Sequence, residues 1–256
     1  MLDPAPEPQA PEPQPTPVEA RPAILPVQRL GAFVEVLLCS GFPTQLFLIA
    51  VLTGFGMPLR TAAGDLSPRF VFTISMLDTV FVIGLVLFFL KAHRESARQV
   101  LLGARPVLRE AFLGVMLMPL IFLWVFLILA VIITFAPQLH NVAKNPLEDM
   151  LKNRQDALIF AIVVTIAGGV REEVQRGFIL HRFSQYLGGG AAGIVVFSVL
   201  FGFGHIDQGI DAAIATGLLG AAWGGIYLLR RSIIAPMVSH SGFNAAEIFV
   251  YVLARR

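Results

Sequence analysis

The sequence is poor in charge. Charged residues make up 14% of its 256 residues, against roughly a quarter in a soluble domain, while 56% are hydrophobic and the mean hydropathy is +0.75. Such a composition excludes an ordinary soluble enzyme, and successive apolar runs leave no stretch long enough for a separate soluble core. We therefore predict an integral membrane protein organised as one polytopic domain.

Cysteine is almost absent. The single Cys39 lies inside an apolar run, which excludes disulfide stapling and a CxxC metal site. The net charge of +2 is too small to indicate a nucleic-acid partner, and the basic residues gather at the ends of apolar runs, as membrane topology requires. The lipid bilayer is therefore the expected partner, and no nucleic acid is expected.

The amino-terminal segment lacks aromatic residues and holds nine of the seventeen prolines. A chain with so few apolar groups cannot offset the entropy lost on ordering. We predict a proline-rich disordered tail over residues 1–28, serving as a solvated spacer. It does not resemble a signal peptide, because it lacks a basic start followed by an apolar core.

Apolar runs follow one another through the rest of the chain. About twenty such residues cross the roughly 30 Å hydrocarbon layer as a helix, and the alternation of a transmembrane barrel is absent. We predict an all-α polytopic bundle of about seven to eight spans, with amino-terminal helices over 29–150 and a catalytic transmembrane domain over 151–256. The predicted spans are Phe33–Phe55, Phe70–Leu90, Ala111–Ala136, Ala157–Leu180, Ala191–His205, Ile210–Leu229 and Ile233–Leu253.

Basic residues give a partial indication of orientation. Five of them lie within the segment 91–109, which the positive-inside rule places in the cytoplasm. Seven spans then put the amino terminus and the pair Arg230–Arg231 on the same side. Arg255 and Arg256 fall on the other side, against the rule.

Ionisable groups inside apolar spans are costly, by about 2.5 to 3.5 kcal/mol at the helix centre on insertion scales, so each one is a candidate for function. Glu35 lies near the start of the first span, where a carboxylate at headgroup level is the favoured interpretation. Asp78 lies deeper in the second span. It could be a structural partner for an interior arginine or amide, or it could belong to a site.

The second half of the chain carries three polar motifs on three predicted helices. In "EEVQR", Glu172 and Arg176 share one helix face, and Glu173 points about 100° away from it. "FGFGH" brings Phe201 and His205 onto one face, and "HSGFN" does the same for His240 and Asn244. Alone, the first motif could be an interfacial cluster and each histidine a packing group. Together, in helices that cannot turn them toward lipid, they predict one convergent interior site.

The residue types in this set are those of a hydrolytic site. A carboxylate can take a proton from water, an imidazole can hold or relay it, and an amide or second imidazole can donate to a developing oxyanion. No serine nucleophile elbow is present, and Cys39 has no histidine near it in sequence. The set predicts amide hydrolysis without a covalent nucleophile.

In this order, EExxxR, FxxxH and HxxxN resemble the motifs of the CPBP family of intramembrane proteases, which includes type II CAAX prenyl endopeptidases and bacteriocin-processing or Abi proteins. The resemblance spans roughly Leu151 to Leu253, and all three motifs match without departure. It implies that Glu172 is the water-activating base, assisted by His205, and that His240 and Asn244 stabilise the oxyanion. Glu173 and Arg176 would then orient the base and balance its charge.

The resemblance also bears on metal dependence, on the substrate and on the membrane in which the protein lies. Two histidines and a glutamate are a known zinc set, but the HExxH helix is absent and a metal-free glutamate mechanism uses the same residues, so both no cofactor and a divalent metal such as zinc stay open. The resemblance implies endopeptidase cleavage of a membrane-associated or lipidated protein, by CAAX-type processing or related peptide maturation, in the bacterial inner membrane. A non-catalytic membrane scaffold and a small transporter are the alternatives.

Overall fold

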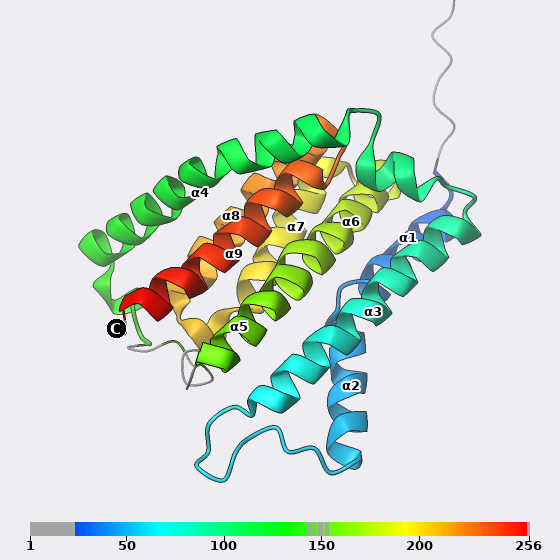
Figure 1. Ribbon diagram of the computed structural model, residues 1–256. Coiled ribbons are helices and arrows are strands. Elements are labelled where there is room, and N and C mark those ends of the chain that lie inside the picture. Colours follow the sequence, from blue (N-terminus) through cyan, green and yellow to red (C-terminus); the bar gives the residue numbers. More distant parts are fainter. Residues whose placement is uncertain (1–23, 143–144, 146, 148–150, 152–153, 255–256) are drawn as a thin grey trace, which may run out of the picture.

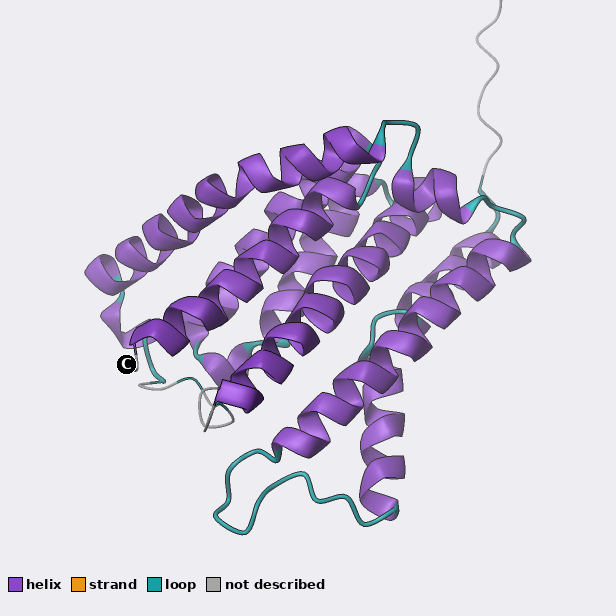
Figure 2. Cartoon of the chain, in the orientation of Figure 1, coloured by secondary structure: helices purple, strands orange, loops and turns teal. Residues whose placement is uncertain are grey.

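The computed structural model describes residues 24–142, 145, 147, 151 and 154–254. The described part of the chain is helical, with no strand assigned in it (Figure 2). This confirms the all-α fold. The α-helices are α1 Pro26–Leu38, α2 Phe42–Gly54, α3 Pro68–Ala92, α4 Val107–Phe135, α5 Arg154–Val163, α6 Glu172–Tyr186, α7 Gly190–Phe203, α8 Ile210–Arg230 and α9 Ile234–Ala254. Short helical segments are η1 Arg98–Leu102, η2 Pro137–Leu139, η4 Val164–Arg171 and η5 Ile206–Gln208.

One uninterrupted helical segment runs through the middle of the bundle. It consists of α5, the π-helical η4 and α6, and it lies between α1 and α3 on one side and α7, α8 and α9 on the other (Figure 1). Helix α4 packs along α9 at the outside of the second group. Side chains on the central segment can therefore contact both halves of the chain.

Three described helices, α3, α4 and α8, are each long and apolar enough to cross a membrane. A fourth span results if α1 and α2 are taken together. The number of full-length apolar spans is thus below the predicted seven to eight, because other predicted runs are bent, short or interrupted by polar groups. The predicted runs Phe70–Leu90, Ala111–Ala136, Ile210–Leu229 and Ile233–Leu253 nevertheless coincide with α3, α4, α8 and α9 to within a few residues.

The predicted first span, Phe33–Phe55, is wrong as one straight helix. Helices α1 and α2 meet at a bend of 42°. Gly41 at the corner has φ of +85°, a conformation that glycine adopts without steric cost, and Pro43 follows in the first turn of α2, where its missing N–H is tolerated. Helix α1 also begins at Pro26, so residues 26–28 of the predicted tail are helical, while residues 1–23 lie outside the described part.

The predicted fourth span contains a wider turn and no break. Gly168 and Gly169 lie within η4, which continues directly into α6. A Cβ atom on Gly169 would overlap Ser241 of α9, and one on Gly168 would lie 2.5 Å from Asn244 Nδ2. The glycine pair therefore permits the close approach of α9 to the central segment.

The predicted fifth span ends early. Helix α7 has 14 residues, about 21 Å of helix, and stops at Phe203. His205 lies in the turn that follows it. This corrects the predicted boundary and places His205 at a helix end, where a turn can direct its ring into the bundle.

The two basic segments assigned to one side of the membrane do lie at the same end of the bundle. Arg230 at the end of α8 binds Glu110 in the first turn of α4, with Nη2 2.5 Å from Oε1. Ile233 N–H donates to the carbonyl of Leu101, at 2.8 Å. The side of the membrane remains a prediction, and Arg255 and Arg256 lie outside the described residues.

Candidate active site

The three motifs converge around His240. Glu172, Glu173 and Arg176 lie in the first turns of α6, His205 lies just after α7, and His240 projects from α9. His240 Nδ1 is 2.8 Å from Glu173 Oε1, and His240 Nε2 is 3.8 Å from Glu172 Oε2. His240 therefore contacts both glutamates of the first motif.

Glu173, and not Glu172, is the ion-pair partner of Arg176. Arg176 Nη1 donates to Glu173 Oε1, which also faces His240. Both side chains of the pair are almost fully buried. Sequence spacing left the partner of Arg176 open, because residues three and four apart are both neighbours on a helix.

Aromatic rings surround the buried charges. The Arg176 guanidinium carbon lies 4.9 Å from the ring centre of Phe201, 5.0 Å from that of Phe197 and 5.6 Å from that of Trp223. The indole also stacks on the His240 ring at 3.8 Å between centres and donates from Nε1 to Ser239 Oγ. These rings fix Arg176 and His240 while excluding water, and cation–π attraction compensates part of the desolvation.

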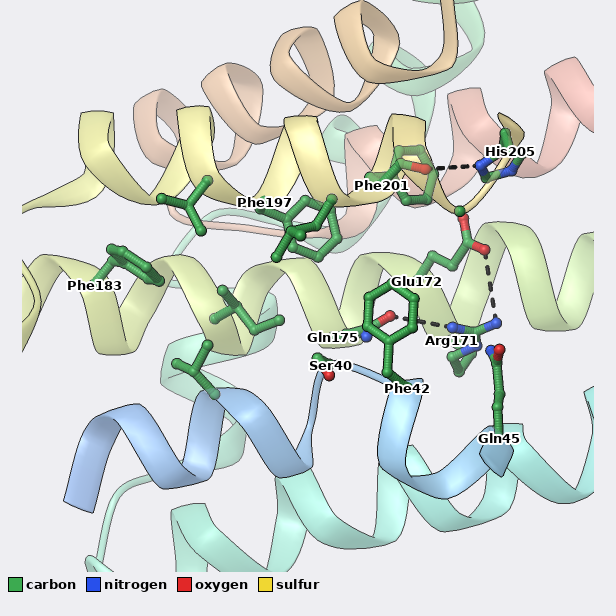
Figure 3. A pocket seen from close by; sticks show the side chains of 15 residues that line it. Ser40, Phe42, Gln45, Arg171, Glu172, Gln175, Phe183, Phe197, Phe201 and His205 are labelled. Carbon is green, nitrogen blue, oxygen red and sulfur yellow. Dashed lines mark hydrogen bonds and ion pairs between the residues drawn. The ribbon is translucent and has the colours of Figure 1, made fainter. Parts of the chain in front are cut away.

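Glu172 is the carboxylate that faces open space. Its Oε1 lies 3.7 Å from Arg171 Nη2, so its two oxygens face a guanidinium and an imidazole, each beyond hydrogen-bond distance. Together with His205 it lines a pocket of about 230 Å³. In Figure 3, Glu172, Arg171, Gln45 and His205 lie toward one end of this pocket and Phe183 lies at the other.

His205 is held by its own motif. Its Nδ1 lies 2.8 Å from the carbonyl oxygen of Phe201, and the two rings are 5.0 Å apart in an edge-to-face contact. The shared face predicted for Phe201 and His205 is confirmed. Because a carbonyl can only accept, Nδ1 carries the proton, and Nε2 of the neutral ring is left as an acceptor.

Asn244 lies one helical turn beyond His240 but is directed elsewhere. Its Nδ2 donates to the carbonyl oxygen of Val164 in η4, at 3.3 Å, and Asn244 is not among the residues that line the pocket. One N–H of the amide therefore satisfies a carbonyl in the π-helical turn. The second N–H is the group with which Asn244 could serve the site.

Sequence reasoning missed Arg171 and Trp223. Arg171 immediately precedes the EExxxR motif and lines the pocket, but the motif directs attention to the residues after it. Trp223 is one of only two tryptophans in the sequence and lies in an apolar span, which favours its interpretation as a core residue. A fourth charge in "REEVQR" was the available signal for Arg171.

Asp78 contacts both an interior arginine and an amide, the two structural partners considered for it from the sequence. The carboxylate of this buried α3 residue accepts from Thr44 Oγ1 at 2.5 Å and from Gln45 Nε2 at 3.3 Å. Its Oδ2 also lies 3.6 Å from Arg171 Nη2. An interior arginine and an amide thus both contact it, and the arginine belongs to the pocket.

Glu35 takes part in an ion-pair cluster between helices. It is buried on α1, where Arg182 Nε lies 2.5 Å and His93 Nε2 lies 2.6 Å from its two oxygens. Arg182 also donates to Glu95 Oε2 at 2.6 Å. Glu35 is thus the counter-ion of a buried arginine six residues beyond Arg176 on the same helix, and its level in the membrane stays a prediction.

The described residues do not gather a metal-binding set. No group of three or more His, Cys, Asp or Glu side chains in this part of the chain is arranged to hold an ion. Glu172, His205 and His240 have suitable donor atoms, and with Nδ1 of each histidine engaged, Nε2 is the ring nitrogen left to ligate an ion. Because these three side chains do not come together as a binding set in the described residues, no catalytic step is derived through a metal.

Comparison with known proteins identifies one segment. Residues 154–246 match the family model described as Type II CAAX prenyl endopeptidase Rce1-like. The matched range runs from α5 into α9 and contains all six residues of the three motifs, which confirms the resemblance inferred from them. No curated protein matches the chain, and no solved structure does.

Proposed function

We propose that this chain, an integral membrane protein whose residues 154–246 form an Rce1-like domain, is an intramembrane endopeptidase in which Glu172 activates water. One observation carries the proposal: Glu172 lines the pocket with both carboxylate oxygens free of close hydrogen bonds, beside His205. A general base needs a free lone pair aimed at an open volume, and Glu172 is the motif carboxylate that has both.

The proposed first step is attack of water on the scissile carbonyl carbon. A water molecule between Glu172 and His205 Nε2 donates to both acceptors, which orients its lone pair toward the carbonyl. Glu172 takes one proton as the carbon–oxygen bond forms and the carbonyl oxygen becomes an oxyanion. Both acceptors are held in place, His205 by Phe201 and Glu172 by the fixed start of α6.

His240 connects the base to the oxyanion. Glu173 accepts from His240 Nδ1, so the neutral ring presents Nε2 as an acceptor toward Glu172. A proton passed from Glu172 makes an imidazolium whose Nε2–H donates to the oxyanion and then protonates the leaving nitrogen as the carbon–nitrogen bond breaks. Asn244 supplies its second amide N–H to the oxyanion, and Glu173 with Arg176 keeps the ring oriented.

The proposed substrate is a membrane-associated or lipidated protein, processed in CAAX fashion or by a related peptide maturation. Support comes from the name of the matched family and from the apolar part of the pocket, which includes Phe183, Phe197 and Ile179. We assign the protein to the bacterial inner membrane. The proline-rich tail takes no part in the proposed chemistry.

The test is a comparison of membrane-protein termini in cells carrying the wild type, Glu172→Ala or Glu247→Ala. Glu247 is an exposed glutamate of α9 outside the pocket and provides a matched control. We expect at least one terminus to be processed with the wild type and with Glu247→Ala but not with Glu172→Ala. Identical termini in all three strains would contradict the protease proposal and favour a non-catalytic scaffold. Glu172-dependent flux in liposomes would indicate a transporter.

The metal question has its own experiment. Purified protein is stripped with a chelator, assayed, and assayed again after zinc is restored. The steps above predict full activity in the stripped protein. Activity that disappears and returns with zinc would replace Glu172-activated water by a metal mechanism using the same residues.

A further inference from the structure

Arg171 lies at the junction of the catalytic segment and the amino-terminal helices. Its Nη2 is 3.6 Å from Asp78 Oδ2 and 3.7 Å from Glu172 Oε1, so one nitrogen stands almost midway between two carboxylates. Its Nη1 donates to Gln175 Oε1 at 3.2 Å. The dashed contacts from Arg171 to Glu172 and to Gln175 are drawn in Figure 3.

The corner between α1 and α2 limits where this guanidinium can go. A Cβ atom on Gly41 would lie 3.6 Å from Arg171 Nη1, in ordinary van der Waals contact, so the corner lies directly beside the guanidinium. Gln175 Nε2 in turn donates to the carbonyl of Cys39 at the same corner, at 2.8 Å. The bend therefore forms one wall against which Arg171 is packed.

Asp78 is itself held rigidly. Thr44 Oγ1 donates to Oδ1 and Gln45 Nε2 donates to Oδ2, and the side chain is almost fully buried. Thr44, Gln45 and Asp78 all precede residues 154–246, the range of the family match. Asp78, a fixed anion outside the Rce1-like domain, thus faces Arg171. Arg171 is the cation beside Glu172, the proposed base of that domain.

We propose that Arg171 is a positioning residue for Glu172 and that Asp78 keeps it at the working distance. This inference rests on the proposed function of Glu172. Asp78 draws the guanidinium to one side, so Arg171 stabilises the charge on Glu172 without forming the close ion pair that would occupy its oxygen. The amino-terminal helices α2 and α3 thereby complete a site whose reacting groups all lie in the carboxyl-terminal half.

The two partners should move the pH dependence in opposite directions. The charged or titratable groups facing Glu172 are Arg171 from η4, His240 from α9 and His205 after α7, with Asp78 of α3 and Glu173 of α6 behind them. Loss of the Arg171 charge favours protonated Glu172 and shifts the acidic limb of the rate profile to higher pH. Loss of the Asp78 charge lets Arg171 close on Glu172 and shifts that limb to lower pH.

The experiment uses membranes from Glu172→Ala cells, in which the uncut substrate accumulates, as the probe for purified full-length variants. Initial rates of terminus formation are measured across pH for wild type, Arg171→Gln, Arg171→Lys and Asp78→Asn. Arg69→Gln, at an exposed arginine of α3, is the matched control. We expect rates to fall about 10- to 100-fold in Arg171→Gln and Asp78→Asn, with opposite shifts of the acidic limb. Arg171→Lys should keep the wild-type limb but not the full rate, because an ammonium lacks the planar fork.

The double variant Arg171→Gln/Asp78→Asn guards against a folding artefact, because it removes Arg171 together with its buried counter-ion Asp78. We expect it to fold, as judged by thermal unfolding in detergent, and to stay slow. A wild-type rate in the double variant, or acidic limbs that shift the same way in the two single variants, would overturn the positioning role. Normal cleavage by Glu172→Gln in this assay would instead overturn the proposed function itself.

Discussion

Helix α6 carries two buried charged clusters that differ in how fully their atoms are paired. The motif cluster, at its start, consists of Glu172, Glu173 and Arg176 with His240. The end cluster, one to two turns further on, consists of His181 and Arg182 with Glu35, His93 and Glu95. Both bring charges from several helices together around an almost fully buried arginine.

In the end cluster, all four carboxylate oxygens are bonded. Each Glu35 oxygen has one partner at 2.5 or 2.6 Å, and the Glu95 oxygens are engaged by His181, Gln185 and Arg182. In the motif cluster, Glu172 makes no hydrogen bond within 3.5 Å among the described contacts, and Glu173 Oε2, Arg176 Nε and Arg176 Nη2 have no hydrogen-bond partner among the described residues, whereas in the end cluster this holds for Arg182 Nη2 alone. Satisfied charges hold helices together, whereas charges with spare capacity can engage water and substrate.

The largest expected effect is on catalysis by Glu172→Gln. The amide keeps the shape of the carboxylate but is a very weak base, so cleavage should fall by about 10² to 10⁴. The thermal unfolding midpoint should stay near that of the wild type, because Glu172 makes no close hydrogen bond. A large loss of stability with retained cleavage would reverse the roles assigned to the two clusters.

Arg182→Gln should break the end cluster. It leaves Glu35 and Glu95 without their shared cation, and removing one partner from a buried ion pair costs about 3 to 5 kcal/mol. Denaturation in detergent, compared with Arg69→Gln as an exposed control, measures the loss. An unchanged unfolding midpoint would show that the end cluster does not stabilise the junction of α1 and α6.

Glu173→Gln should have a mixed effect. It removes the counter-charge of Arg176 and weakens the orientation of His240, so we expect both a slower reaction, by up to about 100-fold, and a lower unfolding midpoint. Paired rate and unfolding measurements on one preparation separate the two effects. Loss of rate without loss of stability would place Glu173 among the reacting groups.

The smallest expected effect is that of acid on the end cluster. Burial opposes ionisation of Glu95, but hydrogen bonds from Gln185, Arg182 and His181 outweigh it and hold the pKa of this loop residue below its ordinary value of 4.5. A lowered pKa gives stability that is present above pH 4.5 and lost as the pH falls below it. Unfolding midpoints measured from about pH 6 to about pH 3 should fall less steeply in Glu95→Gln than in the wild type.

Much of the fold could be predicted from hydropathy, because lipid forces the backbone into helices. Hydropathy did not predict the bend at Gly41 and Pro43, since apolar residues continue through it and only the local backbone departs from a helix. Hydropathy did not predict the end of α7 before His205 for the same reason. Boundaries are set by single residues, and an average over a window does not resolve them.

The site could be predicted as a set of residues but not as a set of contacts. The motifs named Glu172, Glu173, Arg176, His205, His240 and Asn244, and five of them lie together around the pocket and its buried support. Asn244 lies beside them with its amide toward Val164. The partner of Arg176 could not be assigned from the sequence, because spacing along a helix permits contacts at both three and four residues.

From the sequence alone came the membrane environment, the helical fold and a set of candidate reactive groups, because burial of charge in lipid is tolerated only where function or pairing requires it. The tertiary structure alone decided which glutamate is paired and which is free, and that Asp78 and Glu35 from the first half face arginines in the second. The reason is physical: periodicity fixes neighbours within one helix, whereas the rotation of one helix against another follows from how all of them pack.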